Sequence, residues 1–161
     1  MNKALRFLYS LFAVGITAVV CSYFTQSGVR LFYSTLELPP FTPPNAVFPI
    51  VWSALYALMV ISYYIVLGAK DIFQIQKATL LFLGQLFLQM VWCFLFFYSG
   101  YFLYGLIVMI LLLWTVWIMI KRFTEINPTA GYLQYLYFMW LLAATYMNTG
   151  VVYLNGASLI L

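Results

Sequence analysis

The side chains that could do chemistry inside the apolar stretches of this sequence are amides and indoles. Gln85, Gln89 and Asn148 lie within long apolar runs, where an uncharged polar group is costly unless it finds a partner or lines a cavity. Three stripes at helical spacing carry such residues or tryptophan: Gln85, Gln89, Trp92 and Phe96; Trp52, Tyr56, Met59 and Tyr63; Leu136, Trp140, Ala144, Met147 and Val151. Any one stripe is more often ordinary helix packing. Three in one small chain favour an aromatic cavity for a flat, apolar ligand.

Most catalytic chemistry is disfavoured by what the sequence lacks. Without a single histidine, there is no Ser-His or Cys-His base, no imidazole metal ligand and no His-ligated haem. The three acids, Glu37, Asp71 and Glu125, lie too far apart in the sequence to suggest a carboxylate pair or a hard-metal cage. Cys21 and Cys93 both lie in apolar runs, where a thiol is usually a small packing residue. We therefore predict no catalytic residue and no metal site.

The elements that position these residues are expected to lie in a lipid bilayer. The chain is 66% hydrophobic and only 6% charged, whereas soluble domains carry about 25% charged residues. Ten charged side chains are too few to cover a globular surface, so lipid is the expected surrounding medium. The net charge of +4 comes from seven scattered basic residues, which does not support a nucleic-acid partner.

The apolar runs predict an all-α bundle of five transmembrane helices in a single domain, residues 1–161. A membrane helix needs about 20 apolar residues, and residues 78–120 are uncharged throughout. As one helix they would be about 64 Å long, so we expect this run to fold back once, at Ser99-Gly100. The five helices are predicted at about residues 5–25, 47–68, 79–98, 101–120 and 132–154.

The first apolar run has a second interpretation, a cleaved signal peptide. Lys3 and Arg6 would form its positively charged start. The apolar stretch is long, however, and residues 24–26 offer no cleavage site between small residues. We therefore expect an uncleaved first helix.

The positive charges predict the orientation of the bundle. Five helices place the N-terminus and the second and fourth connections on one face, which then holds Lys3, Arg6, Lys70, Lys77, Lys121 and Arg122. The opposite face holds Arg30 alone. This asymmetry places the N-terminus on the side from which the protein is inserted. Trp114 and Trp117, shortly before Lys121, are typical of side chains that anchor a helix at the membrane surface.

The first connection, residues 28–46, differs from the others in being long and rich in proline. Its prolines force the residues before them into extended conformations and make a stiff arm: Pro39, Pro40, Pro43 and Pro44. A rigid linker is the alternative interpretation, but linkers are more often polar and glycine-rich. This segment instead carries Phe32, Tyr33 and Phe41 and is apolar enough to lie back over the helix ends. We expect it to form a folded cap.

Several motifs along the chain have a recognisable spacing. They are FYSTLELPPFTPP at residues 32–44, FPIVWSALY at 48–56, Gly84-Gln85-Leu86 with Trp92, and WLLAATYMN at 140–148. In this order and spacing they resemble the translocator protein family, also called peripheral-type benzodiazepine receptors or tryptophan-rich sensory proteins. The resemblance covers nearly the whole chain.

The resemblance implies a pocket inside the five-helix bundle, closed by the first loop. Family pockets take protoporphyrin IX and related tetrapyrroles, isoquinoline carboxamide and benzodiazepine-type drugs, and in animal members cholesterol. Matched positions and the stripes above give the candidate ligand-binding residues: Trp52, Trp140, Ala144, Met147, Asn148, Trp92, Gln85, Phe48, Tyr56, Pro43 and Pro44. We expect protoporphyrin IX or a related tetrapyrrole as ligand and no covalent cofactor.

Departures from the family pattern shape these expectations. Leu38 stands where the family has lysine, which predicts weaker discrimination in favour of acidic tetrapyrroles. No basic residue follows Asn148, so the proposed cholesterol motif of animal members is absent and a bacterial type of protein is indicated. The family's helix-three contact between two subunits uses a small residue four places after Gly84, where this chain has Leu88. A homodimer is thus expected from the family resemblance, and the residue at position 88 does not support it.

Three functions compete at this point. The favoured one is a membrane receptor or transport protein that senses, sequesters or translocates a porphyrin or another hydrophobic ligand. The second is an enzyme that degrades porphyrin with light and oxygen, drawing its reactivity from the excited ligand. The third is a membrane scaffold that recruits another protein. The expected location is the bacterial cell membrane, or the mitochondrial outer membrane in a eukaryote.

Overall fold

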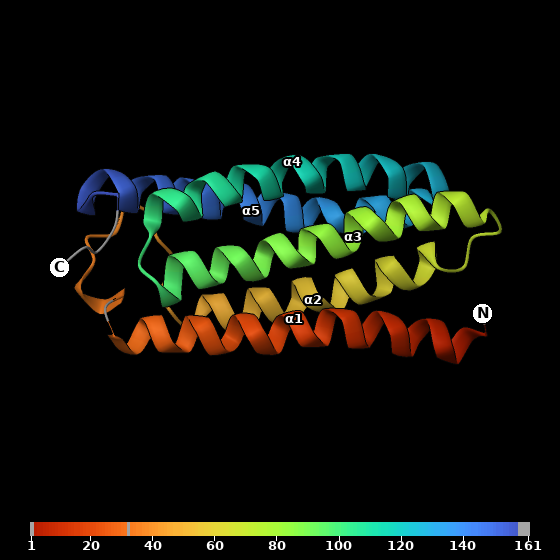
Figure 1. Cartoon of the computed structure of the whole chain (residues 1–161), viewed down its shortest axis with the longest axis horizontal. Helices are drawn as coiled ribbons and strands as arrows, with labels where there is room; N and C mark the ends of the chain where they lie inside the picture. The colour runs from red at the N-terminus through yellow and green to blue at the C-terminus, as the bar shows by residue number, and fades with distance from the viewer. Residues whose placement is uncertain (1, 32, 158–161) are drawn as a thin grey trace.

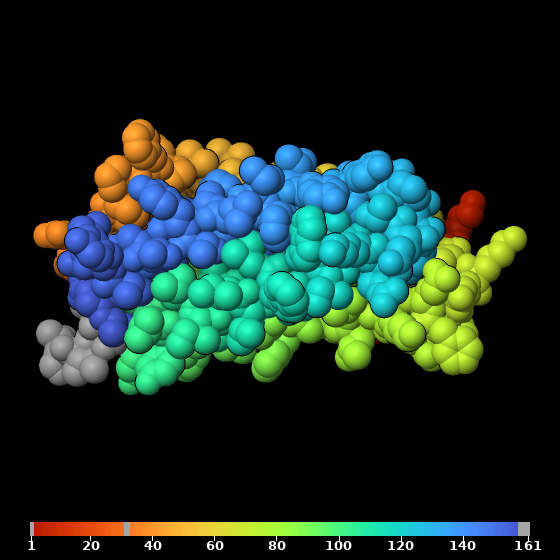
Figure 2. Space-filling view, turned by 90° about the horizontal axis from the view of Figure 1, so that it is seen from above, coloured from red at the N-terminus to blue at the C-terminus, as the bar shows by residue number. Residues whose placement is uncertain are grey.

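Five long helices lie side by side along the longest axis of the computed structural model, which describes residues 2–31 and 33–157 (Figure 1). The elements are α1 Lys3–Leu31, η1 Tyr33–Thr35, α2 Val47–Val66, α3 Ile72–Cys93, η2 Phe94–Tyr98, α4 Phe102–Ile126 and α5 Pro128–Asn155. Helix α1 begins at one end of the bundle and α5 ends at the other. Helices α4 and α5 pack most extensively on each other and together cover one face (Figure 2).

Within residues 2–31 and 33–157, four segments are long and apolar enough to cross a membrane: residues 3–30, 47–66, 72–98 and 102–126. They present large apolar side chains outward, with Leu80 75%, Val19 71% and Ile50 71% exposed. Contiguous apolar surface on several helices suits lipid rather than water. This is the arrangement of a multi-pass membrane protein. Helix α5 is equally long but carries several tyrosines and amides, and it packs along α4 and α2.

Four of the five described helices are longer than the apolar runs that predicted them, whereas α2 ends at Val66, two residues before its predicted end. Helix α1 continues to Leu31, α3 begins at Ile72 and α4 ends at Ile126. A charged or polar residue ends the apolar part of a span without ending the helix, because backbone hydrogen bonding continues. The starts of α3 and α5 are set instead by caps: Asp71 accepts from the backbone of Phe73 at 2.9 Å, and Asn127 accepts from Thr129 at 3.0 Å.

The turn between α3 and α4 lies at the predicted Ser99-Gly100. Before it, the helix widens into the π-helical segment η2, and the Tyr101 N–H then donates to the Leu95 carbonyl at 2.9 Å. Gly100 has φ = 67°, a left-handed conformation that favours glycine. The glycine therefore lets the chain reverse directly into α4.

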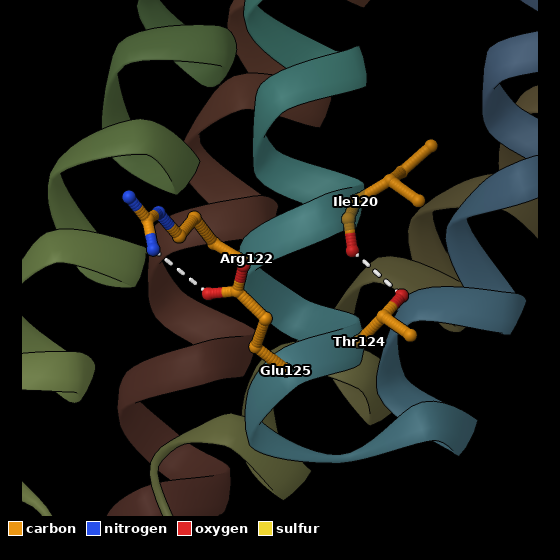
Figure 3. Close-up of polar contacts among 4 residues, drawn as sticks. All are labelled: Ile120, Arg122, Thr124 and Glu125. Carbon is orange, nitrogen blue, oxygen red and sulfur yellow. Dashed lines mark hydrogen bonds and ion pairs between the residues drawn. The ribbon is translucent and has the colours of Figure 1, made fainter.

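Six of the seven basic residues, all except Arg30 in the last turn of α1, lie at or near the bundle end where α1 begins and α4 ends (Figure 1). There, Arg122 donates to Glu125 at 2.8 Å in an exposed ion pair, and Thr124 bonds to the Ile120 carbonyl (Figure 3). Lys121 lies over the ring of Trp117, with Nζ 5.1 Å from the centroid. An indole under a lysine at a helix end suits the boundary between lipid and water.

Candidate ligand-binding cavity

A cavity of about 420 Å³ lies in the half of the bundle nearer the C-terminus. Small-molecule sites commonly occupy roughly 300–1,000 Å³. Side chains from α1, α2, α3 with η2, α5 and the first loop all contribute to its walls. The cavity is thus lined by segments from both halves of the chain, and α4 contributes no lining residue among those described.

The walls from α2 and α5 are aromatic. Phe48 and Trp52 lie one turn apart on α2, and the Phe48 ring meets Trp140 of α5 edge to face at 5.8 Å between centroids. Trp52 lies against the Tyr56 ring at 5.5 Å. Ala144 follows Trp140 by one turn on the same face, and its small side chain leaves space beside the indole. Met147 and Val151 continue this wall.

Asn148 orients the wall formed by α3. Its Oδ1 accepts a hydrogen bond from the Trp92 indole at 3.1 Å, and its Nδ2 donates to the Phe102 carbonyl at 3.0 Å. The Trp92 ring is stacked on Phe96 at 5.7 Å. Because both ends of the amide are bonded within the protein, Asn148 acts through Trp92 rather than by offering a free polar group to a ligand.

The first loop lines the cavity through Leu38, Thr42 and Asn45. It is tied to α5: Asn155 exchanges two hydrogen bonds with the backbone of Glu37, at 2.9 and 2.8 Å. The Tyr146 hydroxyl donates to the Pro40 carbonyl at 2.8 Å. These bonds hold the proline-rich segment beside the helix ends.

The wall from α1 is a part of the site that sequence reasoning missed. It presents Cys21, Ser22, Thr25, Gln26, Val29 and Arg30, followed by Tyr33 of η1. A signal was present, since Ser22, Gln26 and Arg30 recur every four residues on one helix face. Tyr33 is buried, and burial raises the pKa of its hydroxyl.

Of the predicted site residues, Gln85 does not line the cavity. It is fully buried in α3, about two turns before the cavity-lining Trp92, and its Oε1 accepts from the Tyr137 hydroxyl at 3.0 Å. Gln89 lies between Gln85 and Trp92 on α3, and its side-chain amide donates to the Tyr56 hydroxyl at 2.8 Å. The amides of this stripe therefore join α2, α3 and α5 below the cavity, while Trp92 and Phe96 further along line it.

Three further expectations need correction. Pro43 and Pro44 are not among the lining residues, because the side chains that reach the cavity are their neighbours Thr42 and Asn45. Phe41 does not lie back over the helix ends: its φ is 64° and its side chain is 96% exposed. Leu136 is 61% exposed, off the stripe that Trp140 begins. The expected aromatic at position 32 lies outside the described residues.

The remaining predicted site residues all line this one cavity: Trp52, Trp140, Ala144, Met147, Asn148, Trp92, Phe48 and Tyr56. The sequence spacing brought them together because each set shares one helix face. Among the described residues that line it, Arg30 is the single charged side chain.

The molecule is thus a multi-pass membrane protein with an aromatic cavity inside its helical bundle. The model of the TspO/MBR family matches residues 8–154, so the chain belongs to this family. It is 32% identical over 152 residues to "Tryptophan-rich protein TspO" of Archaeoglobus fulgidus, covering 94% of this chain and 98% of that protein.

Two further relatives are similar. "Tryptophan-rich protein TspO" of Chlorobaculum tepidum is 31% identical over 137 residues, covering 83% of this chain and 85% of the relative. "Protein CrtK" of Rhodobacter capsulatus is 30% identical over 149 residues, covering 91% of this chain and 93% of the relative. These matches confirm the resemblance drawn from the motifs. The relatives come from bacteria and an archaeon, which agrees with the predicted bacterial cell membrane.

Proposed function

We propose that the cavity binds a porphyrin, with protoporphyrin IX as the expected ligand, for sensing, sequestration or translocation. The observation that carries this proposal is the meeting of Trp52, Trp92 and Trp140 around one space. A planar macrocycle gains free energy by burying its faces against indole rings. The membership in the TspO/MBR family and the tryptophan-rich composition of the named relatives support the same function.

In this proposal all five helices cross the bilayer and the first loop caps the cavity. Helix α5 supplies one wall and packs against α4 along its length, so it lies at the same depth as its neighbours. The bonds from Asn155 and Tyr146 to the loop support a cap that rests on α5. A homodimer remains an expectation from the family. Gly84 would leave room for a neighbour, since a Cβ there meets nothing within 4 Å in this chain.

Titration of protoporphyrin against the tryptophan fluorescence of the purified protein tests the ligand. Trp52→Ala and Trp140→Ala should each weaken binding by on the order of 1 kcal/mol or more. Trp114→Ala is the matched control, because Trp114 is 67% exposed on α4, away from the cavity. If both cavity variants bind like the wild type and the control does not, the ligand binds elsewhere.

The same cavity suits the alternative, porphyrin degradation, because its walls carry oxidisable side chains: Cys21, Cys93, Tyr56, Trp52, Trp92 and Trp140. Illumination of the complex with and without oxygen separates binding from degradation. Bleaching no faster than that of protoporphyrin in detergent alone would exclude the enzyme. Bleaching that is faster, and slower in Trp52→Phe, would favour it.

A further inference from the structure

The walls of the cavity differ in character. Helices α2 and α5 contribute rings and aliphatic groups, whereas α1 contributes Ser22, Thr25, Gln26 and Arg30. Ser22, Gln26 and Arg30 recur at steps of four along α1, and Thr25 lies three residues after Ser22, so the four residues form one continuous polar strip. A ligand that fills this space meets an apolar surface on one side and polar groups ending in a cation on the other.

The end of α1 that carries Arg30 is held in place. Gly28 lies so close to η2 that a Cβ built on it would clash with the Phe97 carbonyl. One turn after the strip ends, the Tyr33 ring packs on the Phe97 ring at 5.8 Å between centroids. The backbone on both sides of Arg30 therefore rests on η2, while the Arg30 side chain itself is exposed and lines the cavity.

The guanidinium of Arg30 has no acidic partner within the described part of the chain. The ion pair found among these residues joins Arg122 and Glu125, at the opposite end of the bundle. Glu37, the acid nearest in sequence, bonds to Asn155 through its backbone. An arginine beside an apolar space is suited to a planar carboxylate, which it can bind through two parallel hydrogen bonds.

We propose that Arg30 recognises an anionic group on the ligand of this cavity, and that the ligand is a flat ring system with a carboxylate on the edge that faces α1. The inference rests on the proposed function and adds to it the residue that recognises the carboxylates of the ligand. It also adds to one sequence-based expectation. Leu38 removes the lysine of the family pattern, but Arg30 supplies a cation to the same cavity from α1, so some preference for acidic over neutral tetrapyrroles should remain.

The test compares protoporphyrin IX with its dimethyl ester, which keeps the ring and loses both charges. Binding is measured in nanodiscs of neutral phosphatidylcholine, so that no anionic lipid competes for Arg30. The wild type should bind the acid more tightly than the ester. Arg30→Gln should weaken binding of the acid about tenfold or more and leave the ester unchanged. Arg30→Lys, which keeps the charge without the planar fork, should fall between the two.

Arg122→Gln is the matched control, since it removes a cation at the far end of the bundle and should alter neither affinity. Equal weakening of acid and ester by Arg30→Gln would assign Arg30 a structural role and overturn the proposal. An unchanged affinity for both would do the same, and would leave a lipid headgroup phosphate as the partner of Arg30.

A second pair of probes keeps this test separate from the porphyrin proposal. If the wild type binds neither porphyrin, the proposed function fails. Pyrenebutyrate and its methyl ester then present a smaller flat ring with and without a carboxylate. A preference for the acid that disappears in Arg30→Gln supports the anion site, and the absence of any preference overturns it.

Discussion

In the half of the bundle near the N-terminus, aromatic rings fill the interior. Tyr63 stacks on Phe82 at 4.0 Å between centroids, Phe82 on Phe123 at 6.0 Å, and none of the three is exposed. In the other half, Trp52 and Trp140 stand around a cavity of about 420 Å³. We call these the closed half and the open half. Both are rich in aromatic side chains, so aromatic composition alone does not make a binding site.

Small residues account for part of the difference. In the closed half, the Ser62 hydroxyl donates to the Ala130 carbonyl at 2.7 Å, which brings α2 against α5. A Cβ on Gly131 would clash with Thr124, whose hydroxyl bonds back to Ile120 as Figure 3 shows. Helices that approach this closely leave no space between them. In the open half, the small residue Ala144 faces the cavity instead of another helix.

The largest contrast is expected between two aromatic truncations. Phe82→Ala removes a fully buried ring of the closed half and should lower the free energy of unfolding by about 3–5 kcal/mol. Trp52→Ala, in the open half, should cost far less stability and instead weaken protoporphyrin binding. Denaturant unfolding in detergent, paired with a binding titration, measures both. Equal losses of stability would show that the open half is packed as tightly as the closed half.

A second contrast concerns the approach of α4 and α5. Gly131→Ala should destabilise the protein by about 1–3 kcal/mol, because the new methyl group collides with Thr124. Adding Thr124→Ala removes the nearest colliding atom, the hydroxyl oxygen, and should restore part of the loss, because the Thr124 Cβ and backbone N, each 2.9 Å from the added Cβ, remain. The double-mutant cycle on unfolding free energies tests this coupling. A double variant no more stable than Gly131→Ala would place the strain elsewhere.

Enlarging Ala144, in the open half, should change ligand binding rather than stability. Ala144→Leu places a larger side chain into the cavity, where it should weaken protoporphyrin binding while changing the free energy of unfolding by less than about 1 kcal/mol. Fluorescence titration and unfolding in the same detergent provide both values. Unimpaired binding would mean that the ligand does not reach this wall.

The stripe on α2 explains how far the sequence could predict the site. Trp52, Tyr56, Met59 and Tyr63 share one helix face, as their spacing indicated, but Trp52 and Tyr56 line the cavity while Met59 and Tyr63 are fully buried. One stripe thus packs against other helices at one depth and lines the cavity at another. Periodicity gives the face of a helix, and it cannot give the width of the gap opposite.

Other features depended on contacts that no local pattern contains. The predicted hairpin at Ser99-Gly100 followed from the length of the apolar run and a turn residue, both visible in the sequence. The α1 wall was missed because its polar strip resembles a helix end near the membrane surface. It becomes a cavity wall only because α1 packs on η2 and α2. Phe41 was misplaced since its positive φ depends on the path of the loop, not on its apolar side chain.

The smallest effect is expected where the loop rests on the open half. Tyr146→Phe removes one exposed hydrogen bond, to the Pro40 carbonyl, and should lower stability by no more than about 1 kcal/mol. If the loop caps the cavity, its opening should nevertheless become easier, and limited proteolysis between residues 37 and 46 should be faster. Tyr153→Phe is the control, since Tyr153 is 88% exposed on the same helix. Protoporphyrin should protect the loop in the wild type and less so in Tyr146→Phe, because closure then depends on fewer contacts. Cleavage at the same rate with and without protoporphyrin, in a protein that binds it, would reduce the segment to a rigid linker.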